Sequence, residues 1–125
     1  MLEHRGSGVA PWNVEGHPIA VDGGRVLVDG APLVFFHFHG LKRIAPRLYE
    51  SGLAGYRVPM NRTLRDAVYE PYLRELHEIE DRLDRDVPHH GARWGSVRSP
   101  RQPYLALAKG LLRRTLVVAE RRSAR

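Results

Sequence analysis

Two closely spaced glycine turns constrain the fold of this chain more than any other feature. The turns Asp22-Gly23-Gly24 and Asp29-Gly30 separate three short apolar runs, which are Ile19–Val21, Arg25–Val28 and Pro32–Phe38. Asp-Gly between β-prone runs is typical of hairpins, because a type I′ turn needs a positive φ at both central residues. The sequence therefore predicts a small antiparallel three-stranded meander over residues 18–39.

The third run of this meander is apolar at successive positions. Leu33-Val34-Phe35-Phe36 has no alternation, so we expect a strand that is covered on both faces. A chain of 125 residues with one small meander can cover only part of such a strand. Residues 41–62 follow, and their scattered Gly and Pro predict an ordered loop with short helical turns.

From Thr63 the apolar period changes to three or four residues, which predicts an amphipathic helix over about 63–85. Thr63 and Asp66 resemble a capping box, and Pro71 predicts a kink or a break. We expect His77, which stands among glutamates, to be a surface residue. The overall prediction is an α+β chain with a meander, a kinked helix, a linker and a terminal amphipathic helix.

The charge is distributed unevenly along the chain. The formal net charge is +6, yet residues 1–90 carry 11 Lys or Arg against 13 Asp or Glu. The last 35 residues carry nine Lys or Arg and one acid, Glu120. We therefore divide the chain into a body (1–86), a flexible Pro/Gly/Ser/Arg linker (87–103) and a basic amphipathic helix and tail (104–125), with the helix itself over about 104–121.

Composition excludes several classes. The chain has no cysteine, so disulfide scaffolds and thiolate-ligated metals are excluded, and a reducing compartment is favoured. No apolar run approaches the roughly 20 residues that span a bilayer, and the N-terminus lacks the apolar region of a secretory signal. We predict a cytoplasmic protein, with the basic tail as a peripheral contact to the inner membrane face.

The distinctive cluster for chemistry is Phe35-Phe36-His37-Phe38-His39-Gly40-Leu41-Lys42-Arg43. Residues two apart on a strand share a face, so His37 and His39 point the same way and could bind a divalent metal. Gly40 allows a close backbone approach, and Lys42 and Arg43 suit phosphate oxygens. From the residues alone, a His-x-His pair on a strand is more often structural than functional.

This cluster resembles the H-x-x-G-x-x-K motif of GT-A-fold, glycogenin-like glycosyltransferases, which use nucleotide-sugar donors. The resemblance implies that His37 is a ligand of Mn²⁺ or Mg²⁺. It also implies that Gly40 and Arg43 contact the donor diphosphate, with Lys42 beside Arg43. Residues 8–83 are similar to the C-terminal portion of bacterial enzymes of this type. The shared pattern comprises Trp12-Asn13, then Phe35–Gly40, then Tyr69 and Tyr72.

We expect this chain to lack two features of the family, which are its N-terminal nucleotide-binding region and its Asp-x-Asp metal motif. The resemblance thus implies an incomplete part of a larger α/β GT-A domain, inactive alone, which an N-terminal partner segment would complete. A truncated or mis-started reading frame is the alternative explanation of the same pattern.

Three further residues have competing interpretations. Trp12 could stack on a sugar and Asn13 could bind substrate hydroxyls, as weak substrate contacts together with His39, but packing and turn roles are commoner. His17 could join a metal site.

The competing function for the whole chain is a non-enzymatic binding module whose basic tail meets an anionic membrane or nucleic acid. The acidic balance of residues 1–90 makes nucleic acid the less favoured partner.

Overall fold

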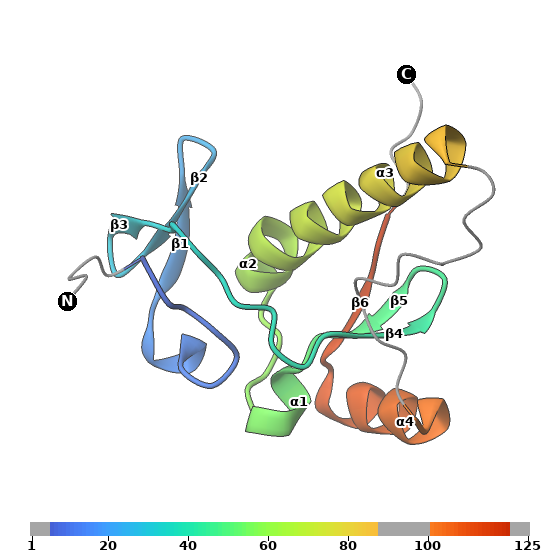
Figure 1. Ribbon diagram of the computed structural model, residues 1–125. Coiled ribbons are helices and arrows are strands. Elements are labelled where there is room, and N and C mark those ends of the chain that lie inside the picture. Colours follow the sequence, from blue (N-terminus) through green and yellow to red (C-terminus); the bar gives the residue numbers. More distant parts are fainter. Residues whose placement is uncertain (1–5, 88–100, 121–125) are drawn as a thin grey trace.

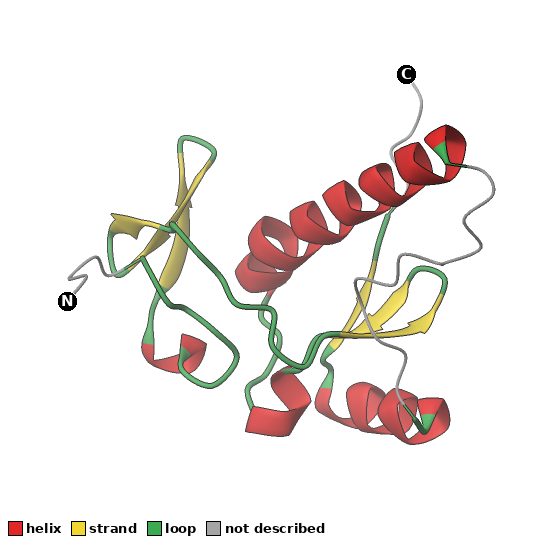
Figure 2. Ribbon diagram, in the orientation of Figure 1, coloured by secondary structure: helices red, strands yellow, loops and turns green. Residues whose placement is uncertain are grey.

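The computed structural model describes residues 6–87 and 101–120 and confirms the α+β class. An extended segment (33–41) joins two three-stranded antiparallel sheets, with the orders β1-β2-β3 and β4-β5-β6, and one long helix contacts both (Figures 1 and 2). Most of the linker at 87–103, as well as residues 1–5 and 121–125, lies outside the described residues.

The predicted meander forms at the expected place. Strands β1 (Ile19–Asp22), β2 (Arg25–Val28) and β3 (Ala31–Pro32) pair antiparallel in sequence order. Gly23 and Gly24 have φ of 54° and 79°, and Asp29 and Gly30 have φ of 52° and 79°. Both two-residue turns therefore have the two positive φ values of the tight hairpins that the sequence predicts.

The third strand is much shorter than predicted, and the prediction of burial on both faces is wrong. Beyond Pro32 the chain continues as an extended segment, in which Phe36 is buried and forms a parallel bridge with Val9. Val34 and Phe35 are 66% and 57% exposed. The apolar run therefore packs on one side only, through buried Phe36 and half-buried Leu33.

The prediction of a loop over residues 41–62 is also wrong. It contains the hairpin of β4 (Lys42–Ala45) and β5 (Leu48–Glu50), followed by the predicted helical turn α1 (Leu53–Tyr56). Strand β6 (Leu116–Val118) pairs with β5 and completes the second sheet from far along the chain. These strands were missed because they are short and β6 is remote in sequence.

The long helix runs from Arg62 to Asp86 as α2 (Arg62–Leu64), a π-helical segment (Arg65–Tyr69) and α3 (Glu70–Asp86). Asn61, not Thr63, is the N-cap, and its side chain accepts a hydrogen bond from the Leu64 N–H. The π segment directly precedes Pro71. A wider turn there relieves the clash between the proline ring and the preceding carbonyls.

The last helix ends earlier than the sequence predicts. Helix α4 spans Pro103–Arg113, and Arg114 takes a left-handed conformation with φ of 53°. The chain then reverses into β6, because the run Thr115–Val118 is rich in β-branched residues. The C-terminal segment is thereby part of the second sheet and is not an isolated tail helix.

The two sheets and the long helix share one hydrophobic core. Its largest fully buried side chains are Tyr49 of β5, Leu53 of α1, and Leu64, Tyr69 and Leu73 of the long helix. In Figure 1, α3 lies on one side of the second sheet and α4 on the other. Each candidate site residue of this sheet therefore points either toward α3 or toward α4.

Candidate functional site

Neighbouring residues of β4 point to opposite faces of the second sheet. Lys42 pairs with Glu50 and Arg43 pairs with Tyr49 in the β4–β5 register. Because side chains alternate along a strand, Lys42 and Glu50 face α4, whereas Arg43 and Tyr49 face α3. The two cations that the sequence groups together therefore serve different surroundings.

On the α4 side lies a cavity of about 350 Å³. Its lining residues come from the segment before β4, from β4, β5, α1 and α4, and are His39, Gly40, Lys42, Glu50, Gly52, Gly55, Tyr56, Ala106 and Lys109. Lys42 and Lys109 are the two lysines of the chain, and both border this cavity. Two ammonium groups and an imidazole around one hollow suit an anion with several oxygens.

The carboxylate in the cavity wall is engaged with the protein. Glu50 is buried, its Oε2 accepts from the Gly52 N–H at 3.1 Å, and its Oε1 accepts from the Thr115 hydroxyl at 3.1 Å. Glu50 thus joins the start of α1 to the start of β6. The polar side chains that remain in the cavity lining are those of Lys42, Lys109, His39 and Tyr56.

Two glycines allow the chain to cross itself at the cavity wall. Gly40 and Gly52 have φ of 75° and 89°. A Cβ on Gly52 would stand 2.1 Å from the carbonyl oxygen of His39, and one on Gly40 would stand 3.3 Å from the Gly52 Cα. Gly40 therefore has a structural reason to be glycine, besides the ligand approach that the sequence suggested.

An exposed cluster of rings adjoins the cavity. Trp12 contacts His37, His39 and Tyr56, with ring centroids 5.4, 5.6 and 6.1 Å apart, all edge to face. His37 and His39 are 5.4 Å apart, which confirms that they share a side. His39 and Tyr56 belong both to this cluster and to the cavity lining, so the two features are continuous.

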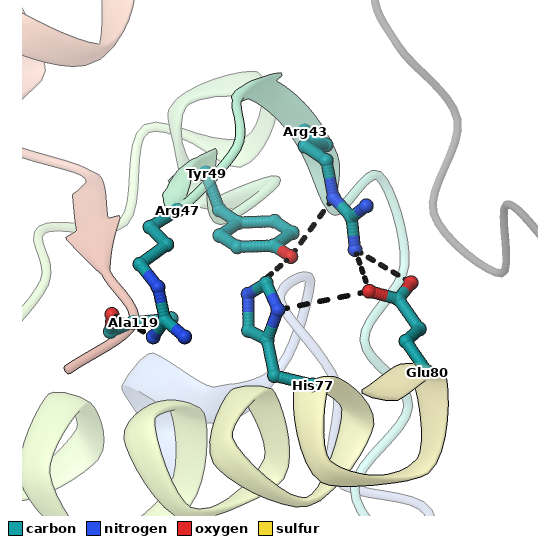
Figure 3. A network of polar contacts seen from close by, with 6 residues as sticks. All are labelled: Arg43, Arg47, Tyr49, His77, Glu80 and Ala119. Carbon is teal, nitrogen blue, oxygen red and sulfur yellow. Dashed lines mark hydrogen bonds and ion pairs between the residues drawn. The ribbon is translucent and has the colours of Figure 1, made fainter. Parts of the chain in front are cut away.

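Arg43 is held in a polar network on the α3 side (Figure 3). Its Nη2 donates to Glu80 Oε1 at 2.6 Å and Oε2 at 2.8 Å, and its Nε donates to the Tyr49 hydroxyl at 2.9 Å. The side chains of Arg43 and Glu80 are only 16% and 18% exposed. The guanidinium is thereby occupied in joining the second sheet to the long helix.

His77 is part of this network, so its prediction as a surface residue is wrong. Its Nε2 lies 3.0 Å from the Tyr49 hydroxyl. Burial and the positive charge of Arg47 lower the pKa of His77, although Glu80 opposes them. The folded protein therefore favours the neutral imidazole.

This lowered pKa predicts a loss of stability in mild acid. The unfolded His77 takes up a proton near pH 6.5 and the folded one only at a lower pH, so stability falls as the pH drops below about 6.5. In His77→Gln, urea unfolding at pH 7 and pH 5 should show a smaller loss than in the unaltered chain. An equal loss in both proteins would exclude His77 as a source of this dependence.

The remaining candidates lie elsewhere. Asn13 Oδ1 accepts from the Ala10 N–H, and its Nδ2 donates to the Gly8 carbonyl, so its side chain is used within a turn. His17 Nδ1 lies 2.7 Å from Asp29 Oδ2 beside the first hairpin. His17, which precedes β1, is therefore paired with the turn between β2 and β3 and is not part of the ring cluster.

The side chains that the structure describes do not by themselves make a divalent-metal site. Within residues 6–87 and 101–120, no group of three His, Asp or Glu side chains could hold a metal ion. The expectation that the chain lacks an Asp-x-Asp triplet needs a correction, since Asp84-Arg85-Asp86 has that spacing. Both carboxylates are exposed on α3, where residues two apart point to different sides, so they do not converge on one ion.

Three neighbours of the cluster at residues 37–43 were not predicted from the sequence, namely Lys109, Tyr56 and Gly52. The available signal was the rarity of lysine, with two among 20 basic residues, but nothing in the spacing links Lys42 to Lys109. Their proximity depends on α4 packing against the second sheet. That packing follows from the β5–β6 pairing, which was not predicted.

Part of the chain is similar to a known protein of Bacillus subtilis. The chain is 31% identical over 84 residues to the "Uncharacterized protein YfnD" of Bacillus subtilis (strain 168). The match covers 66% of this chain and 26% of YfnD, so the chain corresponds to about a quarter of that relative. No protein family profile and no solved structure matches the chain.

Proposed function

We propose that the chain is the C-terminal segment of a nucleotide-sugar glycosyltransferase of the GT-A type, and that its cavity receives the donor diphosphate. The observation that carries the proposal is the convergence of Lys42 and Lys109, from β4 and α4, on one cavity. The resemblance of residues 37–43 to the diphosphate motif supports the same location. In this assignment Lys42, and not Arg43, takes the phosphate contact.

The cavity has the size and chemistry for this role. Ligand pockets commonly measure about 300–1,000 Å³, and this one measures about 350 Å³. Lysine binds phosphate as a point charge, so two lysines neutralise much of a diphosphate without a fixed geometry. The exposed ring of Trp12, next to His39 and Tyr56, offers an apolar surface to the sugar or the base.

Sugar transfer itself needs groups beyond those described. The nucleotide-binding region that the resemblance implies, and carboxylate ligands for Mn²⁺ or Mg²⁺ beside His37, would come from an N-terminal partner segment. We therefore expect the chain alone to bind a donor weakly and not to transfer sugar. Turnover of a UDP- or GDP-sugar by the purified chain would contradict this part of the proposal.

Calorimetric titration with pyrophosphate and with UDP tests the cavity. Lys42→Ala and Lys109→Ala should each weaken binding about tenfold, because each removes one charge-assisted contact. Arg74→Ala is the matched control, since Arg74 is an exposed cation of α3. Affinity for both ligands should fall with added salt.

The variants also give the outcome that would refute the site. Unchanged affinity in both lysine variants would contradict it, and so would an equal loss in Arg74→Ala, which would indicate attraction by net charge alone. Uridine, which lacks phosphate, should bind more weakly than UDP. Equal binding of uridine and UDP would also argue against a diphosphate cavity.

A further inference from the structure

Helix α4 carries an exposed apolar face. Tyr104, Leu105, Leu111 and Leu112 are 63–85% exposed. At 100° per residue these positions fall within roughly a third of the helix circumference, so they form one stripe. No helix among the described residues combines the length and hydropathy needed to cross a bilayer.

The opposite side of α4 fixes the direction of this stripe. Gly110 is buried, and a Cβ there would lie 2.3 Å from Leu116 Cδ2 and 3.5 Å from Glu50 Cγ. The helix therefore packs closely against the second sheet at Gly110, where a side chain would not fit. Leu105, Leu111 and Leu112 are exposed on the side of the helix away from this contact.

The surroundings of the stripe are positively charged. Residues 101–119 contain four cations, Arg101, Lys109, Arg113 and Arg114, and no Asp or Glu. Lys109 follows Leu105 at i+4 and borders the stripe, whereas Arg113, four residues later, lies further round the helix toward the sheet. An apolar stripe with cations at its border is the pattern of a helix that lies in a membrane interface.

We propose that the outer face of α4 binds the surface of an anionic lipid bilayer, with its leucines at the level of the acyl chains and its cations among the head groups. Charge complementarity selects this occupant, because residues 101–119 carry four cations and no carboxylate, and Glu50, which lines the cavity with Lys109, is engaged with Gly52 and Thr115. A bilayer also accepts a single convex helix face, for which a protein partner would need a matching groove. The proposal stands independently of diphosphate binding in the cavity.

Vesicle flotation of the full chain tests this proposal. Vesicles of phosphatidylcholine alone are compared with vesicles in which phosphatidylglycerol replaces part of it. The chain should bind the anionic vesicles more tightly, and added salt should weaken the binding. Binding that is absent, or equal for both vesicle types, would overturn the proposal.

Two variants locate the contact. The double variant Leu111→Ser with Leu112→Ser should bind anionic vesicles at least about tenfold more weakly, because both side chains leave the apolar layer. The double variant Arg101→Gln with Arg113→Gln should bind anionic vesicles roughly tenfold or more weakly, because it removes two positive charges. The matched control is Val34→Ser with Phe35→Ser, which removes a similarly exposed apolar pair from a different part of the surface.

The control and the oligomeric state decide between the bilayer and other occupants. An equal loss in the control pair would refute α4 as the contact. Sedimentation velocity without lipid measures self-association. Dimers that disappear in the leucine variant, together with absent vesicle binding, would show that a second copy covers this face and would overturn the bilayer assignment.

Discussion

Gly52→Ala is expected to lower the free energy of unfolding by about 3 kcal/mol. The φ of Gly52 is 89°, which an L side chain adopts only with strain. The added Cβ would also stand 2.1 Å from the His39 carbonyl oxygen and 3.0 Å from the Gly40 carbonyl carbon. Both obstacles are backbone atoms, so the close contact between residues 39–40 and Gly52 must open to make room for the Cβ.

Gly55→Ala is the matched control for this substitution. Gly55 lies three residues further on, in α1, and lines the same cavity. A Cβ there meets nothing within 4 Å, and its φ is not positive. Urea unfolding should therefore show little change in Gly55→Ala. Equal stability of the two variants would contradict the close backbone contact between residues 39–40 and Gly52.

Glu80→Ala is expected to cost about 2 kcal/mol of stability, because it leaves the Arg43 guanidinium without its carboxylate in a largely buried position. The cost stays below that of a fully buried pair, since both side chains keep some exposure. Removing Glu80 also weakens the link between the second sheet and α3, which Figure 3 shows through Arg43, Tyr49 and His77.

Glu75→Ala in the same helix separates the ion pair from general effects of the substitution. Glu75 is exposed, and alanine raises helix propensity equally at both positions. Thermal or urea unfolding should place Glu80→Ala well below Glu75→Ala. If the two variants unfold together, the Arg43–Glu80 pair contributes no net stability.

The first sheet was predictable because its information is local. Each turn of the meander carries its own Asp-Gly or Gly-Gly signal within two residues of the strands that it joins. The second sheet was not predictable, since β6 pairs with β5 from 66 residues further along the chain. Short strands without turn glycines leave no periodic pattern that a single sequence can reveal.

The candidate site shows the same division. The shared side of His37 and His39 was predicted from strand alternation, and the structure confirms the shared side, although residues 37–39 lie outside any strand. The separate directions of Lys42 and Arg43 follow from the same rule, but only once β4 is known to be a strand. Lys109 could not be assigned, because its approach to Lys42 depends on tertiary packing between α4 and the second sheet.

Nuclear magnetic resonance during a pyrophosphate titration tests the central claim most directly, because it reports where on the chain the anion binds. If the cavity is the diphosphate site, saturable shifts should appear at the amides of Gly40, Lys42 and Lys109, and should disappear in Lys42→Ala. Shifts confined to residues outside the cavity lining, such as the arginines at 113 and 114, would contradict the account.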